Sequence, residues 1–186
     1  SAPASAEDGY DLWLRYRPIE SGAKQQYAAL AKAIVIARRS ATLDAAAGEL
    51  ERGLTGMLGA KVPTTTNIRA GAILIGTPSS SSTIAALGLP LSGLGREGFL
   101  LRTVSVRGAP LTVIVANKDI GVLYGSFAFL RLIQTRRPIS RLNLAERPDS
   151  AVRLLNHWDN LDRTVERGDA GFSLWDWQKL PQWRDP

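Results

Sequence analysis

The segment LLNHWDNLDRTVERGDAGFSLWDW, residues 154–177, concentrates the side chains that could do chemistry. It contains the only histidine of the chain, three of its five tryptophans and five acidic residues. Trp158 stands between His157 and the polar pair Asp159 and Asn160. An indole ring flanked by hydrogen-bonding groups suits a sugar ring, which has C–H groups on one face and hydroxyls around its edge. These four residues are the candidate carbohydrate-binding residues, and packing of Trp158 in an interdomain core explains its presence equally well.

The acidic residues of this segment raise the question of glycoside hydrolysis. That reaction usually needs two carboxyl groups, about 5.5 Å apart for retention and about 6.5–9.5 Å apart for inversion. Closeness in sequence does not establish such a pair, because loop carboxylates more often cap helices, form ion pairs or accept hydrogen bonds. We therefore assign no catalytic residue within this chain. The residues concerned are Asp159, Asp162, Glu166, Asp169 and Asp176.

Three further patterns carry no chemistry of their own. His157, Asp159 and Asp162 form H-x-D-x-x-D, but no other histidine and no cysteine exists to complete a metal site. The run GLGREG (93–98) matches G-x-G-x-x-G, yet a strand is expected after it where the dinucleotide fingerprint needs a helix. The serines at 79–82 lie outside any G-x-S-x-G motif and indicate a loop and a helix cap. We expect neither a metal site nor a nucleotide site.

The composition is typical of a soluble globular protein, with 45% hydrophobic and 22% charged residues among 186. The net charge of +6 is spread along the chain without a nucleic-acid-binding motif, so no nucleic-acid partner is expected. No run approaches about 18 apolar residues, so no membrane span is expected. The absence of cysteine excludes disulfides and thiol chemistry. The opening SAPASAEDGYD is similar to an exported protein after signal cleavage, which slightly favours a periplasmic or secreted location over the cytoplasm.

Hydrophobic periodicity predicts strands mixed with helices over 10–135. The last helix is apolar on nearly every side and should be buried across the sheet. Ser40 or Thr42 is the expected N-cap of the second helix, and Gly59 is its expected stop. The expected strands are 10–16, 71–77, 98–108 and 109–117, the last two as a hairpin, and the expected helices are 23–37, 42–58, 79–88 and 120–135.

This order of elements predicts an α/β (α+β) domain in which helices cover a mixed sheet. We expect a flexible N-terminus over 1–9, the α/β domain over 10–150 and a new unit over 151–186. AVRLLN (151–156) is typical of a short buried strand that delivers the polar and aromatic cluster at its C-terminal end. A TIM barrel builds its active-site face in this way. One strand does not make a barrel, so residues 151–186 are expected to be the beginning of a second domain whose remainder is missing.

Long stretches of the chain resemble family-67 glycoside hydrolases, the xylan α-glucuronidases. LLNHWDNLD, with the later ERG, AG and S-x-W, resembles the start of that family's catalytic barrel. EDGYDLWLRY, GREGFLLRTV and ANKDIGVLYGSFAFLRLIQT resemble its N-terminal domain, and the match covers most of 7–183 in the same order. The resemblance implies a domain like the non-catalytic N-terminal domain of β-hexosaminidases, followed by a (β/α)8 barrel, of which residues 151–186 would be the first βα unit, truncated. It also implies inverting removal of α-1,2-linked 4-O-methyl-D-glucuronic acid from xylo-oligosaccharides, without a metal or an organic cofactor.

Carried over by this resemblance, Trp158 matches the aromatic wall of the glucuronic-acid subsite, and His157, Asp159 and Asn160 match its neighbours. The family's general acid and base belong to later barrel strands, beyond Pro186. This chain would then supply scaffold and one wall of the subsite, and would be inactive alone. The implied partners are glucuronoxylan oligosaccharides, the remainder of the barrel in the same or another chain, and a second copy of the full-length enzyme.

Three positions depart from the family pattern. Arg163 stands where glycine is usual, Asp169 where tyrosine is usual and Phe172 where arginine is usual. If the last two face the acidic sugar, Asp169 would repel its carboxylate, and the missing arginine would remove a partner. Two other functions stay open: a non-catalytic carbohydrate-binding module that uses Trp158, and a domain that docks another chain through its tryptophan-rich tail.

Overall fold

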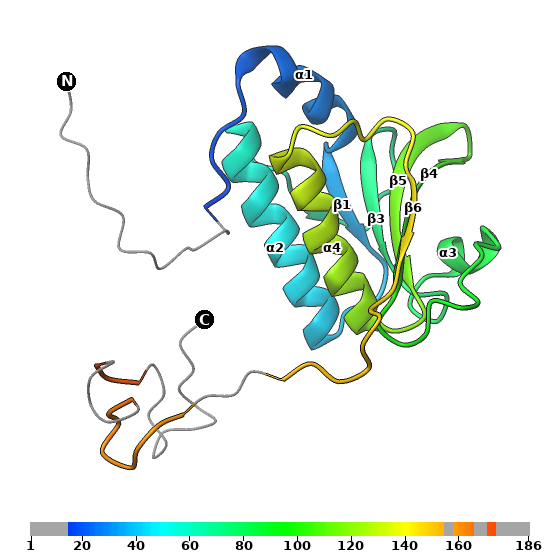
Figure 1. The fold of residues 1–186 in the computed structure, drawn as a ribbon. Helices are drawn as coiled ribbons and strands as arrows, with labels where there is room; N and C mark the ends of the chain where they lie inside the picture. The colour runs from blue at the N-terminus through cyan, green and yellow to red at the C-terminus, as the bar shows by residue number, and fades with distance from the viewer. Residues whose placement is uncertain (1–14, 155–157, 166–170, 174–186) are drawn as a thin grey trace, which may run out of the picture. The chain divides into compact units, whose positions relative to one another are not determined.

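The computed structural model describes residues 15–154, 158–165 and 171–173. The chain divides into two units, Ser1–Pro148 and Asp149–Pro186, and each is considered by itself. The described helices and strands all belong to the first unit (Figure 1). They are α1 (Ser21–Leu30), β1 (Ala33–Ile36), α2 (Ala41–Leu58), β2 (Thr64–Thr65), β3 (Ala72–Gly76), α3 (Ser82–Ala86), β4 (Phe99–Val106), β5 (Ala109–Ala116), α4 (Asp119–Gln134) and β6 (Asn143–Glu146).

The strands form one six-stranded sheet in the order β2-β1-β3-β5-β4-β6. The first four strands in this order run parallel to one another, whereas β4 pairs antiparallel with both β5 and β6. The β4–β5 pair is the expected hairpin. The structure thus confirms an α/β fold with a mixed sheet covered by helices.

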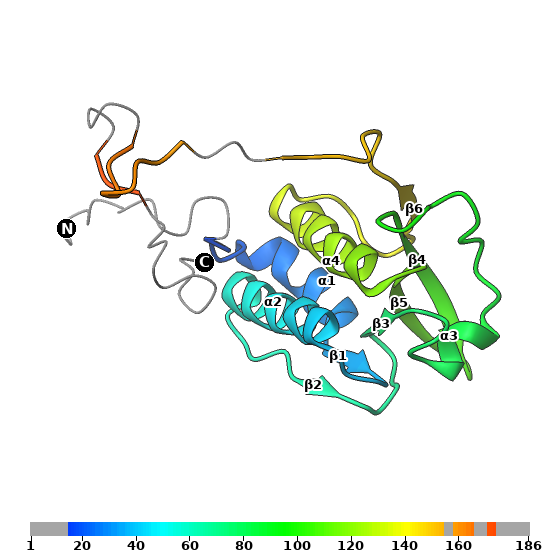
Figure 2. The same ribbon diagram turned by 90° about the horizontal axis from the view of Figure 1, so that it is seen from below.

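Alternation along the strands divides the apolar residues between two faces of the sheet. Ile73 and Ile75 of β3 join the core under α2 and α4, whereas Leu74 between them joins the opposite core. Because successive side chains of a strand point to opposite faces, one run of isoleucine and leucine supplies both cores. Seen from below, α1, α2 and α4 cover one face, and α3 lies toward the other (Figure 2).

Helix α2 begins and ends where local chemistry dictates. Ser40 caps α2 by accepting a hydrogen bond from the amide of Leu43 at 3.2 Å, and Gly59 ends the helix at a φ of 62°. α4 buries Val122, Phe129 and other residues against the sheet, as its apolar sequence predicts. No helix in the described part of the chain is long and apolar enough to cross a membrane.

Several expectations for single elements were wrong. The helix expected over 23–37 ends at Leu30, and residues 33–36 form β1 at the centre of the parallel strands. A fully buried parallel strand is apolar on both faces, so its periodicity does not distinguish it from a buried helix. The connector expected over 136–150 contains β6, which pairs with β4 along the sheet edge.

Strands were also expected over 10–16, at the start of the α/β domain, and over 151–156, at the start of the next unit, and neither is found in the described residues. Arg15 and Tyr16 lie outside any strand, and Tyr16 has a φ of 44°. Residues 151–154 form no strand either, because no described segment pairs with them. The remainder of both expectations, 10–14 and 155–156, lies outside the described residues.

Candidate functional site

Three of the candidate sugar-binding residues, Trp158, Asp159 and Asn160, lie on a small folded loop of the second unit. Isolated bridges pair Asp159 with Val165 and Thr164 with Phe172. A turn closes the loop, with the Arg163 amide donating to the carbonyl of Asn160 at 3.0 Å. These contacts bring the segments 158–165 and 171–173 together. His157, Glu166 and Asp169, together with the tail from 174, lie outside the described residues.

Two of the five acidic candidates hold this loop together. The hydroxyl of Ser173, a side chain that is almost fully buried, donates a hydrogen bond to the carboxylate of Asp159. Asp162 accepts hydrogen bonds from the Thr164 amide at 2.9 Å and from the Thr164 hydroxyl at 2.7 Å. Sequence reasoning missed Ser173, although it is the serine of the S-x-W motif.

The environment of Asp162 is unsuited to a general acid. Hydrogen bonds from the hydroxyl and the amide of Thr164 lower the pKa of the Asp162 carboxyl. A general acid needs the opposite shift, so that it still holds its proton near neutral pH. Asn160 also serves the loop, because its side-chain amide donates to the Thr164 hydroxyl at 2.8 Å.

The apolar residues of the same loop face water. Trp158 is 74% exposed, Leu161 is 99% exposed and Phe172 is 76% exposed. An exposed indole is accessible for stacking on a ligand, whereas the polar neighbours Asp159 and Asn160 are engaged in the loop. A role for Trp158, His157, Asp159 and Asn160 in sugar binding stays a prediction.

At position 163 the backbone has the conformation that favours the glycine expected there from the family resemblance. Arg163 has a φ of 71°, a left-handed conformation that glycine adopts without strain and other residues adopt at a cost. A glycine at this position therefore suits the turn. The Arg163 side chain compensates in part by donating to the carbonyl of Ser173 at 3.3 Å.

The other sequence patterns have structural roles. Ser81 caps α3 by accepting from the amide of Ile84 at 3.3 Å. The run at 93–98 leads directly into β4 rather than into a helix. No cluster of three histidine, cysteine or acidic side chains that could hold a metal occurs within 15–154, 158–165 and 171–173.

Comparison with known proteins identifies the class of protein. The model of the glycosyl hydrolase family 67 N-terminus matches residues 12–129, and the model of the family 67 middle domain matches residues 132–185. The two matches together cover most of the chain. It belongs to glycoside hydrolase family 67.

The curated relatives are all named as α-glucuronidases or probable α-glucuronidases. The probable α-glucuronidase A of Neosartorya fischeri is 31% identical over 174 residues, which are 92% of this chain and 20% of the relative. The α-glucuronidase A of Emericella nidulans is 34% identical over 186 residues, 94% of this chain and 21% of the relative. The chain thus spans about a fifth of the length of these relatives.

One solved structure is also similar in part. It is a family GH115 4-O-methyl-α-glucuronidase with specificity for decorated arabinogalactans, 28% identical to this chain. The match covers 54% of this chain and 13% of that chain, with a TM-score of 0.45. A score of this size does not establish a shared fold.

Proposed function

We propose that this chain is the N-terminal part of an α-glucuronidase. The whole enzyme would remove α-1,2-linked (4-O-methyl)glucuronic acid from xylo-oligosaccharides during xylan degradation, with inversion at the anomeric carbon. The observation that carries the proposal is the consecutive match of the N-terminal and middle-domain models of one hydrolase family. The names of the curated relatives support the same activity.

Within that enzyme, the chain would supply scaffold and one wall of the sugar subsite. Asp159 and Asp162 are engaged with Ser173 and Thr164, which leaves them poorly suited to act as an acid and base pair. The catalytic carboxylates would then come from the remainder of the barrel. Trp158 is the residue of this chain that would stack on the uronic acid.

An activity assay tests the assignment of the catalytic groups. The mass-verified 186-residue polypeptide is incubated with aldouronic acids, and free 4-O-methylglucuronic acid is quantified. No release is expected from this chain, and clear release after addition of the remaining barrel is expected if the two parts assemble. Release proportional to the amount of this chain alone would contradict the proposal.

Calorimetry tests the role of Trp158. Titration of the assembled enzyme with an aldouronic acid should show roughly two- to tenfold weaker binding for Trp158→Ala, because stacking on an aromatic ring contributes about 0.5–1.5 kcal/mol. Leu161→Ala is the matched control, since Leu161 is also exposed in the same loop. Equal affinities of the two variants for the aldouronic acid would show that Trp158 is not part of the sugar subsite.

A second function is favoured by the exposed apolar side chains of the loop. Trp158, Leu161 and Phe172 each expose an apolar side chain on the same loop, which suits a sugar-binding module or a docking site for another chain. Sugar binding by this chain alone, lost in Trp158→Ala, would support the module. Light scattering that shows a monomer at all concentrations would count against self-docking.

A further inference from the structure

A polar pocket lies in the first unit at the carboxyl ends of β3 and β5. Its volume is about 500 Å³, within the range that small ligands occupy. Thr77 and Ser79, which follow β3, and Asn117 and Lys118, which follow β5, all line it. The remaining lining residues are Thr42, Arg96, Asp119 and Ile120. The lining is thus rich in hydroxyl, amide and charged groups.

The path of the chain explains why a pocket forms at this edge of the sheet. β3 and β5 are parallel neighbours. After β3 the chain passes to α3, whose Ile84 joins the core on one face, and after β5 it passes to α4, whose Phe129 joins the core on the other face (Figure 2). Connections that leave neighbouring parallel strands on opposite faces open a crevice at the carboxyl ends, where open α/β sheets bind their ligands.

Hydrogen bonds hold the polar groups of the pocket in place. The hydroxyls of Thr77 and Ser79 form one hydrogen bond of 2.9 Å. The Asn117 side-chain amide donates to the carbonyl of Gly95 at 2.9 Å, and so ties the loop that carries Arg96 to the end of β5. A site whose groups are held in advance loses less conformational entropy when a ligand binds.

The charges of the pocket define the class of ligand. Arg96 and Lys118 are exposed cations, and neither side chain forms an ion pair within the described residues. Asp119 is the one acidic residue among the described lining residues, so the pocket carries one net positive charge. A carboxylate monoanion balances that charge, whereas a phosphate dianion would be repelled more strongly by Asp119.

We propose that this pocket binds an acidic sugar, a ligand with one carboxylate and neighbouring hydroxyl groups. Arg96 and Lys118 would hold the carboxylate by charge-assisted hydrogen bonds. Asp119 accepts from the Ser40 hydroxyl at 2.7 Å through Oδ2, and its second oxygen can accept from a hydroxyl of the ligand. The lining residues all belong to the first unit, so the site uses none of the candidate sugar-binding residues of the second unit.

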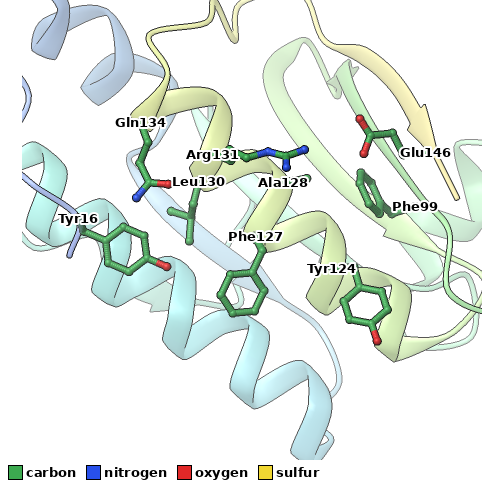
Figure 3. A pocket seen from close by; sticks show the side chains of 9 residues that line it. All are labelled: Tyr16, Phe99, Tyr124, Phe127, Ala128, Leu130, Arg131, Gln134 and Glu146. Atoms are coloured by element: carbon green, nitrogen blue, oxygen red, sulfur yellow. The ribbon is translucent and has the colours of Figure 1, made fainter. Parts of the chain in front are cut away.

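A groove of about 620 Å³ over the outward side of α4 lacks these features (Figure 3). Most of its lining is aromatic or aliphatic, as at Phe127 and Leu130, and its charges are those of Arg131 and Glu146. One cation and one anion leave this groove without net charge for an anionic ligand. Arg131 is exposed like Arg96, and it therefore serves as the matched control.

Titration calorimetry of the full 186-residue chain tests the site. Every variant carries Trp158→Ala, so that the proposed subsite in the second unit does not contribute. D-glucuronate should bind, and Arg96→Gln or Lys118→Gln should weaken its binding about three- to fivefold, because each removes one exposed charged contact. Arg131→Gln should leave the affinity unchanged. Equal affinities of Arg96→Gln and Arg131→Gln, or no binding of D-glucuronate, would overturn the proposal.

Further ligands test the assigned chemistry. D-glucose, which has hydroxyls but no carboxylate, should bind more weakly than D-glucuronate, and added salt should weaken the binding of D-glucuronate. Tighter binding of inorganic phosphate than of D-glucuronate would overturn the acidic-sugar assignment. Tighter binding of an aldouronic acid than of D-glucuronate would support a uronic-acid branch on a xylo-oligosaccharide as the ligand, and equal binding would support the free sugar.

NMR spectroscopy locates the ligand independently of its affinity. D-glucuronate should shift the amide resonances of Ser79, Arg96 and Lys118 in a saturable way, and should leave those of Tyr124 and Phe127 in the α4 groove unchanged. Shifts confined to the α4 groove would overturn the proposal. Because these signals come from the first unit, a negative result would leave the proposed function of the whole enzyme intact.

Discussion

The Tyr16 hydroxyl donates a hydrogen bond to the Glu49 carboxylate, 33 positions further along the chain. Arg52 completes the cluster: its guanidinium donates to both oxygens of Glu49, at 2.8 and 2.9 Å, and lies 5.5 Å from the centre of the Tyr16 ring. Contacts among these three side chains hold Tyr16, near the start of the described residues, against α2. Tyr16 keeps a left-handed φ of 44° in this position, which local sequence preference does not favour.

Replacing Tyr16 by phenylalanine should weaken this attachment. The lost hydrogen bond to a charged acceptor predicts a loss of about 1–2 kcal/mol in the free energy of unfolding, measured by urea denaturation. Glu49→Gln should retain part of the bond. A Tyr16→Phe variant as stable as the natural chain would show that water replaces the contact.

The same tyrosine predicts a dependence of stability on alkaline pH. Burial, the hydrogen bond to Glu49 and the charge of Glu49 raise the pKa of Tyr16 above its usual value of about 10. Since the folded state holds the proton more tightly than the unfolded state, this contribution is complete below about pH 10 and is lost as pH rises further. The stability difference between the natural chain and Tyr16→Phe should therefore stay constant up to about pH 10 and shrink as the pH rises above that value in urea denaturation. A constant difference would contradict the raised pKa.

Glycines of α2 should respond in opposite directions to alanine. A Cβ at Gly56 would lie 3.1 Å from the Tyr16 carbonyl oxygen and 3.2 Å from the Tyr16 Cβ, whereas a Cβ at Gly48 would meet nothing within 4 Å. Gly48→Ala should stabilise by about 0.5–1 kcal/mol through helix propensity. Gly56→Ala should destabilise by about 1–2 kcal/mol, because backbone cannot yield as a flexible side chain does. Thermal unfolding of both variants measures the difference. Equal shifts in Tm would show that residue 16 moves away freely from the added Cβ.

Ser40 links the beginnings of the two long helices. It caps α2, and its hydroxyl donates to the Asp119 carboxylate in the first turn of α4 at 2.7 Å. Ser40→Ala should cost about 1 kcal/mol or more, because it removes both the cap and the link. A double-mutant cycle with Asp119→Ala, measured by urea denaturation, separates the contribution of the helix cap from that of the link to Asp119. Additive losses would mean that the link contributes nothing.

Arg163 allows backbone strain to be separated from side-chain contact. Arg163→Gly removes the strain of the left-handed φ, whereas Arg163→Ala keeps the strain and removes the hydrogen bond to Ser173. The Ser173 amide donates to the Arg163 carbonyl at 2.7 Å, so its hydrogen exchange reports on the loop. Exchange should slow about fivefold in Arg163→Gly for a gain of about 1 kcal/mol, and quicken in Arg163→Ala. Slower hydrogen exchange of the Ser173 amide in Arg163→Ala would show that backbone strain is not the cause of the difference.

The amino-acid sequence by itself determined the elements whose signals are local. The Ser40 cap and the Gly59 stop of α2, the β4–β5 hairpin and the apolar α4 each depend on residues within one short segment. Their existence and type followed from helix caps, turn residues and periodicity. The family-67 resemblance is likewise a property of residue order, and the family models confirm it.

Tertiary structure alone decided the elements and contacts that depend on distant partners. The run Ala33–Ile36 is a strand because β2 and β3 flank it, and Asn143–Glu146 is a strand because β4 accepts it at the sheet edge. Ser173 meets Asp159 only because a turn brings two segments together. Pairing energies of this kind depend on which backbone groups and side chains lie opposite one another in space, and neither composition nor local spacing encodes that arrangement.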